Sequence, residues 1–481
     1  MKYYLSGHDR GGGVQEMLIS LLPDEEHTLC ETREEADCLS LLREEDGMLI
    51  AEAQVTLGGK TTCETCIRPA PEADTEEHKR VRTYAVKTAL YQALLPHLER
   101  KPVWGSLTGV KPAKPVRLAL NEGMKPGEVL DWLEQQYDVS ESRRKLCLAT
   151  AVAAWKTEKS LLPRETQLYI GIPFCPAKCS YCSFVSNDMA HFGHLIAAYV
   201  EALLREVEAA GEMVRRAGIP IGSIYIGGGT PTTLNEEQLE RLLCAVDAAF
   251  DRTHCREYTV EAGRPETITR RKLELLKEHG VGRISINPQT MDDAVLAGVG
   301  RRHTAQDIRD CFAMARQVGD FLINMDLIAG LPGDTEAGLF ESLQQVTALD
   351  PDHVTIHCLA RKKGARLRFG PTGDLDPAAL DKCYAHLAER NYVPYYLYRQ
   401  KYIAGGLENV GFCRPGTASH YNICMMEELS DVIALGSGGV TKLCAEGGRK
   451  IFRLANHKYP KEYIENIDEI LRKKRELYEN P

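Results

Sequence analysis

Between residues 167 and 357, short apolar strands alternate with amphipathic helices, and this pattern limits the chain to few folds. Such alternation is typical of β/α units built around a parallel sheet. The sequence predicts six strands, at residues 168–172, 223–226, 257–261, 283–286, 322–327 and 353–357. Six units are fewer than the eight of a closed barrel, so the predicted fold is α/β with a partial (β/α)6 barrel.

Chemically unusual residues follow these predicted strands one after another. In parallel β/α folds the carboxyl ends of the strands meet at one edge, where sites assemble. A loop with three cysteines follows the first strand, and the run GGGTPT at 227–232 follows the second. The other four strands end at or near Glu261, Asn287, Gln289, Asp326 and His357. We therefore expect one site at this edge, where glycines allow backbone N–H groups to approach a carboxylate.

The cysteine loop reads GIPFCPAKCSYCSF over residues 171–184 and contains Cys175, Cys179 and Cys182. Thiolates presented from a tight, turned loop suit a cubane iron–sulfur cluster. Three of them leave one of four irons without a protein ligand, which favours chemistry at that iron over simple electron transfer. Two other interpretations are buried core cysteines and a zinc site, which needs a fourth ligand. Three cysteines beside two prolines do not follow a core periodicity, so the cluster is favoured.

Composition narrows the class of protein. No apolar run in the 481 residues approaches the roughly 18 needed for a membrane span. The first residues show no signal-peptide pattern, so we expect a cytoplasmic protein. A net charge of −9 argues against a general nucleic-acid binder. Sixteen cysteines without a secretion signal indicate reduced thiols, and an exposed iron indicates a low-oxygen setting.

The length predicts two or three domains. Residues 1–160 are expected to form a separate α+β domain of unknown role. In it apolar residues alternate over 49–57 as in a strand, Gly58 and Gly59 can turn that strand into a hairpin, and 76–98 favours a helix. Residues 165–369 form the predicted (β/α)6 core. Residues 370–481 are expected to form a helical and loop-rich C-terminal cap.

From about residue 167 to 442 the chain resembles the radical S-adenosylmethionine (SAM) superfamily, and in it the oxygen-independent coproporphyrinogen III oxidase group with its longer, HemZ-type branch. The resemblance rests on the ordered segments LYIGIPFCPAKCSYCSF, YIGGGTPTTL, RISINPQTM, GRRHT, MDLIAGLPG and HVTIHCLARKKG. It implies a radical SAM barrel that binds a [4Fe–4S] cluster. In this family an electron from the cluster splits SAM and produces a 5′-deoxyadenosyl radical. It also implies oxidative decarboxylation of coproporphyrinogen III to protoporphyrinogen IX in haem biosynthesis.

The same resemblance assigns residues to these cofactors. Cys175, Cys179 and Cys182 would hold the cluster. The residues that would line the cluster or bind SAM are Tyr169, Tyr181, Gly228, Gly229, Thr230, Glu261, Gln289, Arg301, Asp326 and Ala360. A carboxylate suits the ribose hydroxyls, and an arginine suits the methionyl carboxylate. The resemblance also implies an electron donor such as flavodoxin or ferredoxin.

A basic segment after the sixth strand suggests how the substrate is held. It contains Arg361, Lys362, Lys363, Arg366 and Arg368. A tetrapyrrole with several propionates would be bound by such cations at the barrel mouth. The alternative is a solvated loop, which is what runs of charge usually are.

One position departs from the short enzymes of this group. They carry a fourth cysteine two residues after the third, whereas this chain has Phe184. The same Cys-x-Phe ending occurs in relatives that act as haem chaperones. A haem-binding protein without decarboxylase activity is therefore kept as an alternative. A further alternative is a radical SAM enzyme acting on another substrate, such as RNA, selected by the N-terminal domain.

Overall fold

The structure is a computed structural model of the 481-residue chain. It describes residues 1–479 except 185, 361–364, 366, 368–374 and 446–449. The chain folds into two compact units. One consists of Met1–Leu148 with Arg399–Glu408, and the other of Ala149–Tyr398 with Asn409–Pro481. The division into domains at 1–160, 165–369 and 370–481 stays a prediction.

The first unit contains a five-stranded sheet with helices packed on it. The strands are β1 (Lys2–Ser6), β2 (Thr28–Leu29), β3 (Cys38–Glu45), β4 (Met48–Leu57) and β5 (Lys60–Pro69). Their spatial order is β2-β1-β3-β4-β5. The helices of residues 1–160 are α1 (Gly11–Leu21), α2 (Glu76–Leu94), α3 (Ala113–Asn121), α4 (Pro126–Tyr137) and α5 (Glu141–Ser160), of which α5 continues into the second unit. The predicted α+β character of this region is confirmed.

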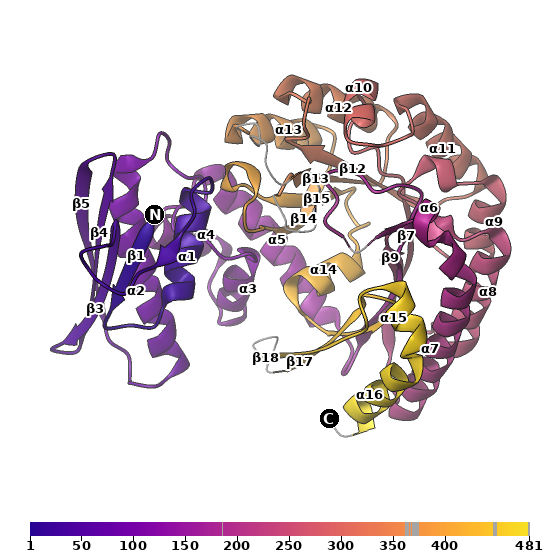
Figure 1. Cartoon of the computed structure of the whole chain (residues 1–481), viewed down its shortest axis with the longest axis horizontal. Helices are drawn as coiled ribbons and strands as arrows, with labels where there is room; N and C mark the ends of the chain where they lie inside the picture. The colour runs from indigo at the N-terminus through magenta and orange to yellow at the C-terminus, as the bar shows by residue number, and fades with distance from the viewer. Residues whose placement is uncertain (185, 361–364, 366, 368–374, 446–449, 480–481) are drawn as a thin grey trace. The chain divides into compact units, whose positions relative to one another are not determined.

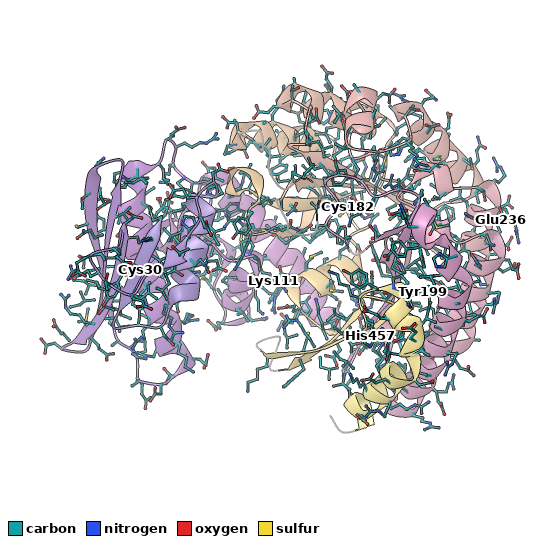
Figure 2. All side chains as sticks on the ribbon, in the orientation of Figure 1. Cys30, Lys111, Cys182, Tyr199, Glu236 and His457 are labelled. Carbon is teal, nitrogen blue, oxygen red and sulfur yellow. The ribbon has the colours of Figure 1, made fainter. Side chains whose placement is uncertain are left out.

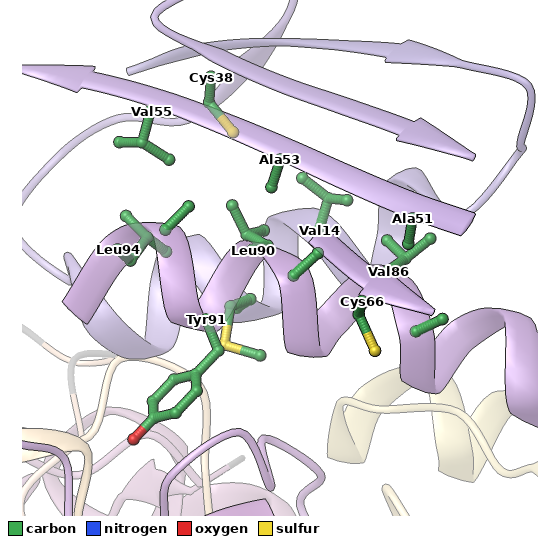
Figure 3. Close-up of a cluster of buried hydrophobic side chains, with 14 of the residues drawn as sticks. Val14, Cys38, Ala51, Ala53, Val55, Cys66, Val86, Leu90, Tyr91 and Leu94 are labelled. Carbon is green, nitrogen blue, oxygen red and sulfur yellow. The ribbon is translucent and has the colours of Figure 1, made fainter. Parts of the chain in front are cut away.

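The core of the first unit lies between β4 and α2. Residues along β4 alternate between buried and partly exposed, and Leu49, Ala51, Ala53 and Val55 are buried. Figure 3 shows the last three of these facing Leu90 and its neighbours on α2. Burying one leucine contributes about 1.5–3 kcal/mol, so this face fixes the register of the strand. The predicted hairpin is confirmed, because β4 and β5 pair antiparallel.

The second unit is organised around an eleven-stranded mixed sheet with the order β14-β15-β13-β12-β11-β10-β9-β6-β16-β17-β18. Its six central strands are parallel. They are β6 (Thr166–Ile172), β9 (Ile221–Gly228), β10 (Glu257–Glu261), β11 (Arg283–Ser285), β12 (Leu322–Ala329) and β13 (His353–Cys358). All six predicted strands are confirmed, and with them the α/β class.

Helices connect these strands and cover one face of the sheet. They are α7 (Ile196–Ala217), α8 (Glu236–Ala249), α9 (Arg270–Glu278), α10 (Asp293–Gly298), α11 (Ala305–Val318) and α12 (Glu336–Ala348). Figure 1 shows α7, α8, α9 and α11 along the outer side of the curved sheet. On β9, Ile224 and Ile226 are fully buried while Tyr225 between them is partly exposed. Tyr225 lies opposite Thr259 on β10, which lies opposite Arg283 on β11, so the inner face is the polar one. Among the described residues no helix is long and apolar enough to cross a membrane.

Further strands extend the sheet at both edges. β15 (Asn409–Cys413) and then β14 (Val393–Tyr398) add antiparallel beyond β13. At the other edge β16 (Asp431–Leu435) pairs parallel with β6, followed by antiparallel β17 (Val440–Ala445) and β18 (Lys450–Ala455). The predicted C-terminal helices are present as α13 (Pro377–Glu389), α14 (His420–Glu427), α15 (Pro460–Glu465) and α16 (Ile467–Glu479). The C-terminal region was predicted to be rich in loops, and this prediction missed the five strands β14 to β18. Short apolar segments of this kind become strands only when they pair with distant parts of the chain.

Candidate active site

The cysteine loop is held together at its base. The chain leaves β6 through the short strand β7 (Phe174–Cys175) and returns through β8 (Asn187–Asp188), and these two strands pair in parallel. The backbone N–H of Asn187 donates to the Pro173 carbonyl at 2.8 Å. The loop is thus anchored directly beyond the carboxyl end of β6, where the sequence predicted it.

The three cysteines differ in exposure and in contacts. Cys175 and Cys179 are buried, and Cys182 is partly exposed. Cys175 Sγ lies 3.4 Å from Thr230 Oγ1, in the glycine-rich turn after β9. Arg264 Nη2 donates to Cys179 Sγ at 2.8 Å. Figure 2 shows Cys182 on the inner side of the sheet. The loop therefore faces the polar side of the strands.

The thiols fit an iron–sulfur cluster. Burial is the main cause that raises the pKa of Cys175 and Cys182, and a neighbouring thiol adds to each shift. In the described part of the chain no group of three or more His, Cys, Asp or Glu side chains is arranged to hold a metal ion. A four-iron cluster does not need such a group, since each thiolate binds a different iron. Its positive irons would keep the buried thiols ionised.

The glycine-rich turn after β9 is bonded to the cysteine strand. The Gly229 N–H donates to the Ile172 carbonyl at 2.8 Å, and the Thr230 N–H donates to the Phe174 carbonyl at 2.7 Å. Gly228 has a φ of +110°, and a Cβ at Gly229 would lie 2.5 Å from the Phe174 oxygen. Glycine is thus required because two backbones approach closely. The two N–H groups expected to face a ligand carboxylate are engaged within the protein instead.

Glu261 ends β10 on the inner face, beside a row of tyrosines. Tyr225 donates its hydroxyl proton to Glu261 Oε1 at 2.5 Å. The Tyr225 ring lies between those of Tyr169 and Tyr421, with centroid distances of 6.3 and 4.4 Å. Burial raises the pKa of Glu261 to about 7, and the Asp326 carboxylate adds to this shift. This carboxyl group therefore titrates near neutral pH and responds to any charged ligand placed beside it.

The pKa of Asp326 on β12 is shifted in the opposite direction to that of Glu261. Burial alone would raise its pKa, but His357, together with Asn324 and Thr355, lowers it. Its Oδ2 lies 3.8 Å from His357 Nε2, and Asn324 Nδ2 donates to its Oδ1 at 2.8 Å. The Tyr398 hydroxyl lies 3.4 Å from the other ring nitrogen of His357. Asp326 is thus a carboxylate that stays ionised and can accept hydrogen bonds from hydroxyl groups.

Gln289 and Arg301 are held by backbone contacts near the same edge. Gln289 has a φ of +71°, which is uncommon outside glycine, and its N–H donates to the Asp326 carbonyl at 2.9 Å. The buried Arg301 donates from Nη1 to the Asn287 carbonyl at 2.9 Å and from Nε to the Tyr181 hydroxyl at 3.2 Å. Arg301 therefore links the cysteine loop to the chain that follows β11.

The carboxyl ends of the strands meet at one edge of the sheet, as the sequence predicted. The cysteine loop, the glycine-rich turn and the ends of β10, β11 and β12 come together through the contacts above. Ala360 comes two residues after β13 and is partly exposed. The five basic residues proposed to hold propionates, Arg361, Lys362, Lys363, Arg366 and Arg368, lie outside the described residues.

Two residues of this edge were not found from the sequence. Tyr225 could have been found, since it alternates with the buried isoleucines of β9 and so must face inward. Arg264 follows Glu261 by three residues in a loop, where an arginine is usually exposed to solvent. No local pattern distinguishes Arg264 from such a residue.

The part of the chain that forms this edge matches known proteins. Residues 169–346 match the Radical SAM superfamily. Over 374 residues the chain is 36% identical to the oxygen-independent coproporphyrinogen-III oxidase-like protein HemZ of Bacillus subtilis, which covers 76% of this chain and 75% of that protein. Over 193 residues it is 37% identical to the heme chaperone HemW of Bacillus subtilis, which covers 40% of this chain and 49% of that protein.

A solved structure has a similar fold over part of the chain. Coproporphyrinogen III oxidase (HemN) from Escherichia coli superposes with a TM-score of 0.51 at 23% identity, over 67% of this chain and 73% of that one. At this identity the likeness concerns the fold. The match to HemZ extends over three quarters of both proteins. The chain therefore belongs to the radical SAM superfamily and, within it, to the HemZ-type family of oxygen-independent coproporphyrinogen III oxidase-like proteins.

Proposed function

We propose that this protein is a radical SAM oxidoreductase that converts coproporphyrinogen III to protoporphyrinogen IX, by two oxygen-independent oxidative decarboxylations in haem biosynthesis. The observation that carries the proposal is that the cysteine loop contacts the segments after two other strands. Cys175 lies against Thr230 after β9, and Cys179 accepts a hydrogen bond from Arg264 after β10. Similarity to HemZ over most of the chain supports the choice of substrate.

The cofactor residues are proposed as follows. Cys175, Cys179 and Cys182 would hold a [4Fe–4S] cluster and leave one iron for SAM. The residues proposed to contact SAM or line the cluster are Tyr169, Tyr181, Gly228, Gly229, Thr230, Glu261, Gln289, Arg301, Asp326 and Ala360. When bound, the cluster and SAM supply the power to abstract a hydrogen atom from an unactivated carbon. The protein supplies binding, orientation and shelter from water.

The two inner carboxyl groups suit different contacts with such a ligand. Asp326, whose pKa is lowered, stays ionised and can accept hydrogen bonds from ribose hydroxyls. Glu261, with a pKa of about 7, gains its charge more easily beside a positive group, so a cationic ligand would favour the ionised form. Tyr225 fixes the orientation of that carboxyl group. Arg301 is held by the Asn287 carbonyl and suits a ligand carboxylate.

Turnover of coproporphyrinogen III tests this proposal. Protein reconstituted with iron and sulfide under anaerobic conditions, given SAM and a reductant, should form 5′-deoxyadenosine together with vinyl-bearing products. Both are measured by liquid chromatography and mass spectrometry. Formation of 5′-deoxyadenosine without loss of carbon dioxide would refute the decarboxylase assignment. Cys179→Ala is the matched control, which should assemble no cluster and form neither product.

The proposed function implies particular partners. The substrate is a small tetrapyrrole, and one-electron reduction of the cluster requires a donor such as flavodoxin or ferredoxin. Exposed iron and reduced thiols are compatible with a reducing compartment, so a cytoplasmic location is proposed. The decarboxylation also requires a terminal electron acceptor, which a turnover assay with alternative acceptors would identify.

A haem chaperone is the second candidate function. Phe184 occupies the position where the short dehydrogenases have a fourth cysteine, and the residue is 69% exposed. Similarity to HemW over part of the chain points the same way. In this case the purified protein should bind haem stably, transfer it to an apoprotein and form no vinyl product. Because Phe184 is exposed, Phe184→Cys should leave folding nearly unchanged, so any change in turnover reports on function.

A further inference from the structure

Arg264 follows the carboxyl end of β10 and reaches into the cysteine loop. Its side chain is nearly inaccessible, with the residue 4% exposed. Nη2 donates to Cys179 Sγ and to the Ala177 carbonyl, each at 2.8 Å. One nitrogen of the guanidinium therefore holds both a sulfur and the backbone just before it, so a shift of Arg264 would move the loop.

The charge of Arg264 is only partly compensated by the protein. Nη1 lies 3.6 Å from Glu266 Oε1, a carboxylate whose side chain is 26% exposed. Within the described residues Nη1 has no hydrogen-bond partner. A buried cation is costly unless an anion lies close to it. The guanidinium thus directs positive charge toward whatever the cysteine loop holds.

We infer that Arg264 is a positioning residue that fixes Cys179 and stabilises the reduced state of the iron–sulfur cluster. This inference rests on the proposed function, because it requires the cluster. Reduction adds one negative charge to a [4Fe–4S] cluster, and its reduction potential depends on net charge and on hydrogen bonds to the sulfurs. Arg264 provides a hydrogen bond and a positive charge from a single buried group, and the low local dielectric strengthens both.

Two substitutions separate the charge of this residue from its shape. Arg264→Met fills similar space without charge or donors, whereas Arg264→Lys keeps the charge and loses the planar fork. Arg256→Met is the matched control. Arg256 precedes the first residue of β10, at the opposite end of the strand, and pairs with Glu165 at 2.9 Å.

The experiment is an anaerobic redox titration of the reconstituted proteins, with the reduced cluster measured by electron paramagnetic resonance. In Arg264→Met the ratio of reduced to oxidised cluster at a fixed potential should fall about tenfold, which for a one-electron couple is about 59 mV. Arg264→Lys should show a smaller fall, and Arg256→Met should match the unsubstituted protein. A ratio in Arg264→Met equal to that of the control overturns the inference.

Iron content provides the second measurement, for variants that do not retain a cluster. Loss of iron in Arg264→Met supports the inference when Arg264→Lys keeps its iron and both apoproteins unfold at the temperature of the unsubstituted apoprotein. Equal loss of iron in both variants with early unfolding of both overturns it, since the role is then structural. An unsubstituted protein that assembles no cluster overturns the proposed function and this inference with it. An intact cluster with unchanged potentials overturns this inference alone.

Discussion

Replacing Glu261 by glutamine should stabilise the ligand-free protein at neutral and alkaline pH. Burial raises the pKa of this carboxyl group from its usual 4.5 to about 7. Between about pH 4.5 and 7 the unfolded chain has therefore released a proton that the folded protein still holds. The folded state binds more protons in this window, so stability falls as the pH rises through it and stays lower above about pH 7.

The size of the effect follows from the shift in pKa. Each pKa unit corresponds to about 1.4 kcal/mol, so the ionised Glu261 costs the folded state up to about 3 kcal/mol. Glutamine has nearly the same shape and can still accept the Tyr225 hydroxyl proton, but it carries no charge. The variant should gain up to about 3 kcal/mol above pH 7 and almost nothing below about pH 4.5.

Asp326→Asn is a control with the opposite sign in the same site. The nearby His357, and then the side chains of Asn324 and Thr355, lower the pKa of Asp326 despite its burial. This carboxylate therefore contributes stability above its unfolded pKa, and the contribution is lost as the pH falls through the folded value. Urea unfolding across the pH range, followed by circular dichroism, measures both variants. A gain for Glu261→Gln that does not grow from acid to neutral pH would contradict burial as the cause.

The remaining predictions concern close contacts. Lys474 Nζ lies 2.5 Å from Glu206 Oε1 with both side chains buried. In urea unfolding Lys474→Met should cost about 3–5 kcal/mol because it leaves a buried carboxylate without its cation, and adding Glu206→Gln, which removes the charge, should recover part of the loss. Trp104→Phe removes the N–H that Glu408 Oε2 accepts at 2.6 Å and should cost about 1–3 kcal/mol in thermal unfolding. Gly229→Ala places a Cβ 2.5 Å from the main-chain oxygen of Phe174 on β7, so it should weaken the binding of SAM. Calorimetry measures this affinity, and an unchanged affinity would show that the turn can move.

The six central strands could be predicted because their signals are local. β10 was found at its observed residues, 257–261, from a short apolar run that ends at a polar residue. The start of α11 has a local signal as well, a capping box in which the Thr304 side chain accepts a hydrogen bond from the N–H of Asp307. The cysteine loop and the glycine-rich turn are also contiguous. Such features depend on a few neighbouring residues and need no knowledge of the tertiary fold.

Other features could not be predicted because distant parts of the chain create them. β16 is five residues long and becomes a strand by pairing with β6, far earlier in the sequence. Arg264 contacts Cys179 across 85 residues. That contact depends on the order of strands in the sheet, since the cysteine loop follows β6 while Arg264 follows β10 two strands away. The spacing of residues along the chain therefore predicts neither the pairing of β16 with β6 nor the contact between Arg264 and Cys179.

Phe184 illustrates how cofactor chemistry and substrate choice can separate in such a fold. Cys175, Cys179 and Glu261 are held by contacts among strand ends, so replacing one of them disturbs its neighbours. Phe184 follows Cys182 by two residues, yet the residue is 69% exposed. An exposed position can change with little cost to folding. We therefore expect family members with different activities to share the strand-end contacts and to differ mainly at exposed loop positions, where a substitution costs the fold little.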